Sequence, residues 1–164
     1  ISLNRNKMDF RKRNRTSNGQ IVGQIATTQV PRYSAPNTFG LAPSIEEITS
    51  ADVAILGVPF DSTVSYRPGA RFGPDHIRNS SRLLRPYNPE TAKWPFLAQQ
   101  VTDLGNVGLN PYDVESALGS IENAARSALE FAKKLLILGG DHTISLPILR
   151  ALKRVHGPIS VIHF

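Results

Sequence analysis

The sequence has 164 residues, of which 40% are hydrophobic and 20% are charged, and this composition is typical of one soluble globular domain. It contains no cysteine, which excludes disulfide bonds, thiolate catalysis and cysteine-based zinc sites. No apolar run approaches the roughly 20 residues of a membrane-spanning helix, and the first residues lack the apolar stretch of a secretory signal. We therefore expect a cytoplasmic protein with no membrane partner.

The formal net charge of +6 is concentrated at the start of the chain. Residues 1–20 contain six basic side chains and one acidic side chain, which leaves 13 basic and 12 acidic side chains elsewhere. No apolar periodicity and no aromatic or Arg-Gly pattern accompanies these charges, so nucleic acid is not an expected partner. The simplest interpretation is a disordered basic arm over residues 1–20. A phosphate-binding arm, or the remnant of a transit peptide in a mitochondrial protein, is the alternative.

Residues 21–50 are polar and are interrupted by three prolines, which predicts an extended entry segment with a short helix near residues 45–48. The apolar run at residues 51–58 has the composition of a strand buried on both faces. An irregular loop rich in Gly and Pro follows it. Gly73 as a cap and Pro74 at the first helical position then predict the start of a helix.

Residues 101–107 predict a short strand interrupted by glycine. Asp113 is a favourable N-cap residue, and apolar residues recur at helical spacing from there to Ala132, which predicts a long helix. Lys133 and Lys134 would complement the carboxyl end of that helix.

Two further apolar runs, at residues 135–138 and 159–164, predict buried strands, and residues 145–155 predict a helix between them. Strands and helices thus alternate without hairpin turns. This order predicts an α/β fold with three α-β-α layers and a mostly parallel sheet.

Ligands of open α/β sheets gather outside the carboxyl ends of the strands, and Gly139-Gly140-Asp141-His142 follows one predicted strand directly. Two glycines let the backbone turn sharply. His142 can bind a divalent metal through a neutral ring nitrogen, and Asp141 can bind the metal or support the ligand. The alternative is that Asp141 caps the next helix and His142 is an ordinary polar loop residue.

The loop after the first strand of the sheet brings further polar side chains to the same edge. Hydrogen-bonding groups at this density suit substrate positioning, but its arginines can equally pair with nearby acids in a structural loop or a subunit contact. The loop residues concerned are Asp61, Ser62, Ser65, Tyr66, Arg67 and Arg71. Asp103 and Asn106, near the end of another predicted strand, have the residue types of turn formers.

Two long motifs resemble one known family. Residues 58–78, VPFDSTVSYRPGARFGPDHIR, resemble the agmatinase-type segment of the ureohydrolase (arginase/agmatinase) family. Residues 138–152, LGGDHTISLPILRAL, with HGPISVIHF after them, resemble the family's Gly-Gly-Asp-His element and the strand beyond it. The resemblance implies an arginase-like fold and the manganese-dependent hydrolysis of a small guanidino compound, with agmatine, cleaved to putrescine and urea, as the first choice. Guanidinobutyrase, guanidinopropionase and arginase activities are the alternatives.

The resemblance also implies roles for individual residues. It makes His142 a ligand of one Mn²⁺ of a two-manganese centre and Asp141 its supporting neighbour. The polar residues of the loop at 61–71 would form the active-site rim, without an assigned catalytic role, and the intact protein would be a homo-oligomer. Thr63 and Asn106 stand where relatives often carry Gly and Asp.

The family's Asp-x-His-x-Asp run and later Asp-x-Asp pair, which supply most of the bridging carboxylates, do not occur in this sequence. One histidine cannot hold two manganese ions. We therefore expect residues 51–164 to be the amino-terminal part of a ureohydrolase domain, with the carboxyl-terminal part missing, the catalytic residues beyond Phe164 and the chain inactive by itself. The alternative is a non-catalytic truncated paralogue that serves as a partner subunit, or a decaying gene product.

Overall fold

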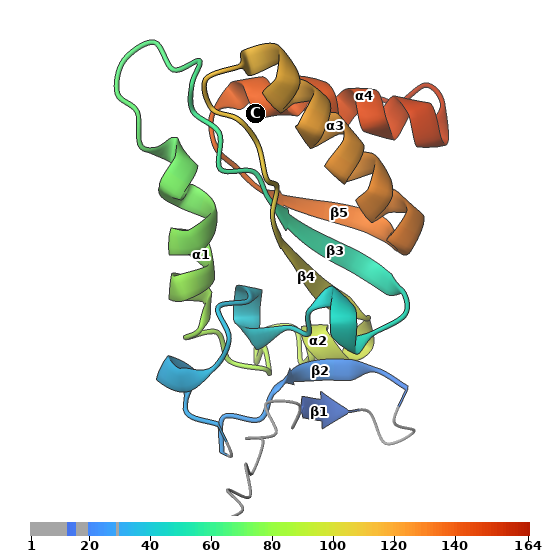
Figure 1. The fold of residues 1–164 in the computed structure, drawn as a ribbon. Coiled ribbons are helices and arrows are strands. Elements are labelled where there is room, and N and C mark those ends of the chain that lie inside the picture. Colours follow the sequence, from blue (N-terminus) through green and yellow to red (C-terminus); the bar gives the residue numbers. More distant parts are fainter. Residues whose placement is uncertain (1–12, 16–19, 29) are drawn as a thin grey trace, which may run out of the picture.

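The computed structural model describes residues 13–15, 20–28 and 30–164, and a parallel three-stranded sheet lies at its centre (Figure 1). The strands are β3 (Ala51–Gly57), β4 (Val101–Asn106) and β5 (Ala132–Leu138), in the order β4-β3-β5. Ala54 of the central strand lies opposite Thr102 of β4 and Leu135 of β5. The expected α/β class with a parallel sheet is confirmed.

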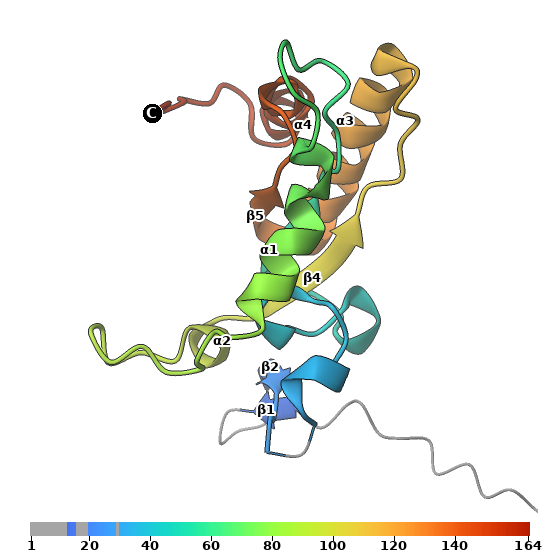
Figure 2. The same cartoon turned by 90° about the vertical axis from the view of Figure 1, so that its left-hand side faces the viewer.

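Helices flank the sheet on both sides (Figures 1 and 2). They are α1 (Gly73–Ser81), α2 (Pro95–Ala98), α3 (Val114–Phe131) and α4 (Ser145–His156). The helix α3 begins as predicted, because the Asp113 carboxylate accepts a hydrogen bond from the Ser116 N–H. Its buried face packs on the sheet and on α4, where Leu56, Ile121 and Ile148 share one apolar core. No helix among the described residues is long and apolar enough to cross a membrane.

The segment before the sheet is less regular. The strand β1 (Arg13–Arg15) pairs antiparallel with β2 (Val22–Ile25), and the helix expected near residues 45–48 is a 3₁₀ helix, η3 (Ile45–Glu47). β1 falls within residues 1–20, where a basic disordered arm was expected. Apart from β1 and Gln20, that arm lies outside the described residues.

The long helix and the following strand meet earlier than the apolar pattern predicts. The helix α3 ends at Phe131, and Ala132 has extended backbone angles and begins β5. Lys133 therefore lies in a strand rather than complementing the helix end, and its ammonium pairs with the Asp52 carboxylate at 2.8 Å. The cause is strand pairing: Ala132 lies opposite Ala51 and both side chains become buried, a tertiary contact that helical spacing does not encode.

The prediction of a buried strand at residues 159–164 is wrong for this structure. These residues form no strand, and the side chains of Val161, Ile162 and Phe164 are exposed. An apolar run becomes a strand only where a neighbouring strand pairs with its N–H and C=O groups. Apolar composition alone does not supply that neighbour.

Candidate functional site

The loop after β3 and the turn after β5 meet at one edge of the sheet, because Gly57 lies opposite Leu138 where the two strands end. Two backbone hydrogen bonds continue this pairing beyond the strands. The Val58 N–H donates to the Leu138 carbonyl at 2.9 Å, and the Asp141 N–H donates to the Phe60 carbonyl at 2.7 Å. Any Cβ at Gly140 would collide with the Phe60 carbonyl oxygen. The close approach of loop and turn therefore requires glycine at this position.

Both carboxylate oxygens of Asp141 are engaged within the chain. Oδ1 accepts the Thr143 N–H at 2.9 Å and so caps the 3₁₀ helix η5 (His142–Ile144). Oδ2 accepts the Thr63 N–H at 3.2 Å and the Thr63 hydroxyl at 2.6 Å. Asp141 thus caps a helix and ties the turn to the opposite loop, and both contacts hold the backbone that carries His142.

The His142 side chain is exposed on this turn, and its ring nitrogens make no hydrogen bond within the described residues. The ring stacks on that of His163, with 5.1 Å between centroids and 20° between planes. A pocket of about 530 Å³ lies beside the two rings. It is lined mainly by apolar side chains, among them Ile137, Ile144, Ile148, Leu149, Val161 and Ile162.

A two-manganese centre needs several ligands that come together from one cluster of side chains. Among the described residues, no group of three or more His, Asp, Glu or Cys side chains gathers to hold a metal. His142 offers a free imidazole, while the Asp141 oxygens already accept three hydrogen bonds. Manganese prefers several oxygen ligands. The described residues alone therefore supply one ligand and do not fit a two-manganese centre.

Asp61 and Arg71 close the loop that follows β3. The Asp61 side chain is buried, and it accepts hydrogen bonds from the Gly69 N–H at 2.6 Å, the Arg71 N–H at 3.1 Å and the Arg71 guanidinium. Burial by itself raises the pKa of Asp61, but these donors outweigh it and hold that pKa below its ordinary value. Asp61 therefore shapes the loop from inside.

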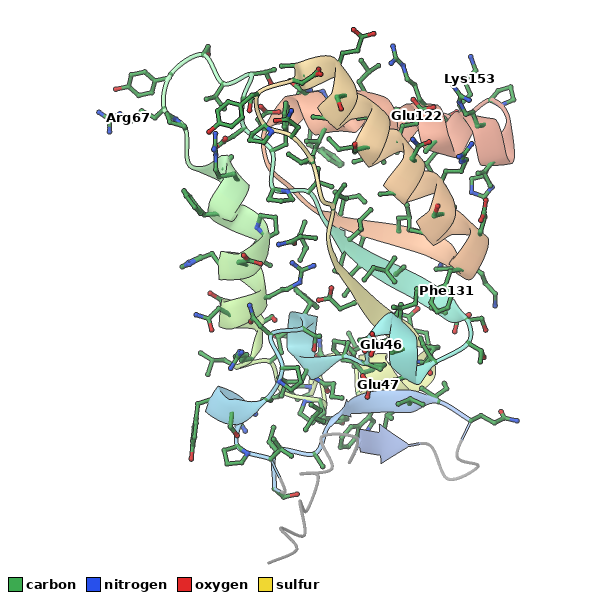
Figure 3. All side chains as sticks on the ribbon, in the orientation of Figure 1. Glu46, Glu47, Arg67, Glu122, Phe131 and Lys153 are labelled. Atoms are coloured by element: carbon green, nitrogen blue, oxygen red, sulfur yellow. The ribbon has the colours of Figure 1, made fainter. Side chains whose placement is uncertain are left out.

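The other four predicted rim residues lie on the outside of the same loop. The Ser62 hydroxyl donates to the Pro111 carbonyl at 2.7 Å, and Ser65 makes no hydrogen bond within the described residues. The Arg67 guanidinium lies 4.9 Å from the centre of the exposed Tyr66 ring. Figure 3 shows Arg67 at the outer end of the loop, pointing away from the sheet. The six residues thus share one loop but not one pocket.

Sequence analysis missed the strongest polar cluster of the structure. Arg78 of α1 is buried and contacts Asp103 through two hydrogen bonds, Nε to Oδ2 at 2.8 Å and Nη2 to Oδ1 at 2.9 Å. It also donates to Asn106 and to the Gly105 carbonyl. Asp103 lies within β4, so the prediction that it forms a turn is wrong. Arg78 stands among mostly polar residues of α1, so no apolar pattern in the sequence indicated that it would be buried.

Thr63 and Thr143 were also missed as site residues. Their hydroxyl oxygens lie 2.6 Å apart, and Thr63 contacts Asp141 as described above. The signal for Thr63 was its position, where a Gly is common among the proteins that the motif resembles. Spacing along the chain cannot show this contact, because 78 residues separate Thr63 from Asp141.

The fold and this edge of the sheet place the chain in a known class: it belongs to the arginase family, whose profile matches residues 51–164. A guanidinobutyrase of Pseudomonas aeruginosa is 40% identical over 142 residues, which cover 85% of this chain and 44% of that protein. A mitochondrial guanidino acid hydrolase of Mus musculus is 45% identical over 142 residues, which cover 87% of this chain and 36% of the relative. The chain thus spans less than half the length of these relatives.

Solved structures agree with this assignment. The proclavaminate amidino hydrolase of Streptomyces clavuligerus is similar with a TM-score of 0.76 and 34% identity, over 81% of this chain and 44% of that one. A formiminoglutamase of Trypanosoma cruzi solved with Mn²⁺ is similar with a TM-score of 0.57 and 25% identity, over 70% of this chain and 41% of that one. The expected family and arginase-like fold are confirmed.

Proposed function

We propose that this chain provides one metal-binding edge of a manganese-dependent hydrolase of guanidino compounds, and that His142 is its ligand to one Mn²⁺. The observation that carries the proposal is the turn after β5. It holds an exposed imidazole without hydrogen-bonded partners at the carboxyl edge of a parallel sheet, in a chain of the arginase family. The manganese-containing relative supports the choice of metal.

A bound pair of manganese ions would supply a hydroxide near neutral pH, because divalent ions lower the pKa of a shared water. The described residues fix the position of the one ligand that they supply. Asp141 fixes the turn that carries His142, and the Asp61–Arg71 pair holds the facing loop closed. The further oxygen ligands have to come from outside the described residues, so hydrolysis is a property that we propose for the complete protein.

The metal role of His142 can be tested in protein expressed from the complete reading frame. We expect His142→Ala to lower Mn²⁺ affinity and urea release by at least about 100-fold, since a direct ligand contributes more than the 10- to 100-fold of a supporting residue. His156→Ala removes an exposed imidazole from α4 and is the matched control. Unchanged manganese stoichiometry and activity in His142→Ala would exclude this role.

Agmatine is the first substrate to test, with putrescine and urea as products. Relatives named for agmatine and for guanidino acids both match the chain, and the two substrate classes differ in the charge of the tail. Agmatine carries an ammonium group, whereas guanidinobutyrate carries a carboxylate. Comparing kcat/KM for the two compounds at the same Mn²⁺ concentration decides between them, and a higher value for guanidinobutyrate would reject agmatine as the preferred substrate.

A second candidate function is favoured by the absence, among the described residues, of a group of side chains that could hold a metal. In this alternative, the chain is a non-catalytic partner of complete subunits, because one ligand cannot hold a two-metal centre. It predicts no urea release by the purified 164-residue chain with Mn²⁺ and agmatine, together with co-purification with a complete homologue. Urea release by the isolated chain would reject it.

We further propose that the complete protein forms a homo-oligomer and is located in the cytoplasm or in mitochondria. Its ligand would be a small guanidino molecule, with no nucleic acid or membrane as a partner. The mitochondrial name of the mouse relative motivates a test of the second location. Light scattering of the complete protein measures its oligomeric state, and cell fractionation measures its location. A strictly monomeric protein would contradict the expected homo-oligomer.

A further inference from the structure

We propose that Thr63 is a positioning residue that clamps the turn at residues 139–143 to the facing loop and thereby fixes the direction of His142. The clamp is a hydrogen-bonded chain from the Thr143 hydroxyl through the Thr63 hydroxyl to the Asp141 carboxylate. Its importance for metal binding rests on the function proposed above. The existence of the clamp is independent of that function.

The donors and acceptors in this series of hydrogen bonds follow from the number of hydrogens that each group can donate. An ionised carboxylate only accepts, so the Thr63 hydroxyl donates its single hydrogen to Asp141 Oδ2 at 2.6 Å. The contact of 2.6 Å between the Thr63 and Thr143 hydroxyl oxygens then requires Thr143 to be the donor. The Thr63 N–H adds a third contact, at 3.2 Å, to the same carboxylate oxygen. The two hydroxyl groups and the carboxylate can therefore form these hydrogen bonds in one arrangement only.

The clamp affects His142 because it holds the two residues that flank His142 in the sequence. His142 lies between Asp141 and Thr143, and Thr63 contacts the side chains of both. Asp141 in turn accepts the Thr143 N–H, which closes the first turn of η5 around His142. Thus a single hydroxyl from the facing loop fixes both chain neighbours of the imidazole.

The backbone hydrogen bonds between loop and turn do not replace this contact. The Val58–Leu138 and Asp141–Phe60 bonds hold the ends of the strands together, but neither of them involves the Asp141 side chain. Among the described residues, Thr63 is the only residue of the loop at 61–71 whose side chain bonds to the turn. Thr63 is itself exposed. Its hydroxyl therefore acts on local geometry more than on global stability, because water competes for the same groups.

Thr63→Val tests the clamp, because valine keeps the branched shape and the backbone N–H but removes the hydroxyl. In the 164-residue chain without metal, we expect the Thr143 amide to exchange with solvent about tenfold faster, and the His142 ring resonances to move towards random-coil positions. Thr63→Ser restores the hydroxyl and should keep both readouts within twofold of the parent chain. Ser65→Ala is the matched control, since it removes an unbonded hydroxyl from the same loop. Equal effects of Thr63→Val and Ser65→Ala, or no effect of either, would overturn the proposal.

Thr143→Val provides a second variant should Thr63→Val lose its dispersed NMR spectrum. It removes the first donor of the chain and leaves the Thr63–Asp141 bond, so we expect a change in the same direction of about two- to threefold. An unchanged Thr143 amide and unchanged His142 resonances in this variant would also contradict the proposed chain of donors.

Addition of MnCl₂ to the same variants, made in protein expressed from the complete reading frame, separates the clamp from the proposed function. If His142 is a metal ligand, its ring protons should broaden at lower Mn²⁺ concentrations than those of the exposed His76, and Thr63→Val should raise the required concentration about threefold. Absence of selective broadening in the parent protein from the complete reading frame would reject the metal role of His142. The exchange of the Thr143 amide would still decide whether the clamp exists.

Discussion

Two polar clusters lie near the carboxyl ends of the strands, and they differ in burial. Arg78 and Asp103, between α1 and β4, are each about 2 to 3% exposed, and every charged group in the pair has several hydrogen bonds. Asp141, Thr63 and His142, between the β3 loop and the β5 turn, lie at the surface. A buried cluster fixes how elements pack, whereas an exposed one can orient a ligand and still admit water and substrate.

The largest expected effect concerns the buried cluster. Arg78→Met leaves the Asp103 carboxylate buried without its partner, so we expect a loss of about 3–5 kcal/mol in the free energy of unfolding. Urea denaturation followed by circular dichroism measures it. The double variant Arg78→Met with Asp103→Leu should be more stable than the single variant, because it removes the unpaired charge. A single variant within about 1 kcal/mol of the parent chain would contradict a rigid packing role.

A smaller effect is expected at Asp61, which closes the loop that carries Thr63. Asp61→Asn keeps the shape of the side chain but removes the charge that accepts from Gly69 and Arg71, and should cost about 1–3 kcal/mol in unfolding free energy. Because the pKa of Asp61 is lowered by folding, its contribution is complete above the unfolded value of about 4 and is lost as the pH falls through the lower folded value. Melting temperatures measured from pH 2 to pH 6 should therefore fall less steeply in acid for Asp61→Asn. Parallel profiles for the two proteins would show that the charge of Asp61 does not stabilise the loop.

The smallest effect is expected for a charge pair on the outer helices. Arg154 of α4 contacts Glu122 of α3 at 2.7 Å, but the arginine side chain is 66% exposed. Exposed pairs contribute about 0.2–1 kcal/mol, so Arg154→Met should change the unfolding free energy by less than about 1 kcal/mol. The same urea measurement as for Arg78→Met gives a direct comparison. A loss as large as that of Arg78→Met would show that burial does not explain the difference between the Arg78–Asp103 and Arg154–Glu122 ion pairs.

Local patterns predicted much of the fold. The apolar runs at residues 51–58 and 135–138 are strands, and Asp113 caps the long helix, because these features depend on side chains close in sequence. The boundary at Ala132 and the apolar run at 159–164 were predicted incorrectly. Both depend on which strand is available as a neighbour, and a linear pattern of apolar residues does not specify a neighbour.

At the site, too, some features follow from local sequence and others depend on neighbours in the folded structure. Two motifs in register identify the family, and the apolar pattern places Asp141 and His142 after a strand, at the edge where ligands gather. The folded arrangement sets what the polar side chains contact. It buried Asp61, paired Arg78 with Asp103 and brought Thr63 to Asp141 across 78 residues. Hydrogen bonds require donor and acceptor within about 3 Å. That proximity is created by tertiary packing, for Thr63 and Asp141 by the parallel pairing of β3 with β5, rather than by spacing along the chain.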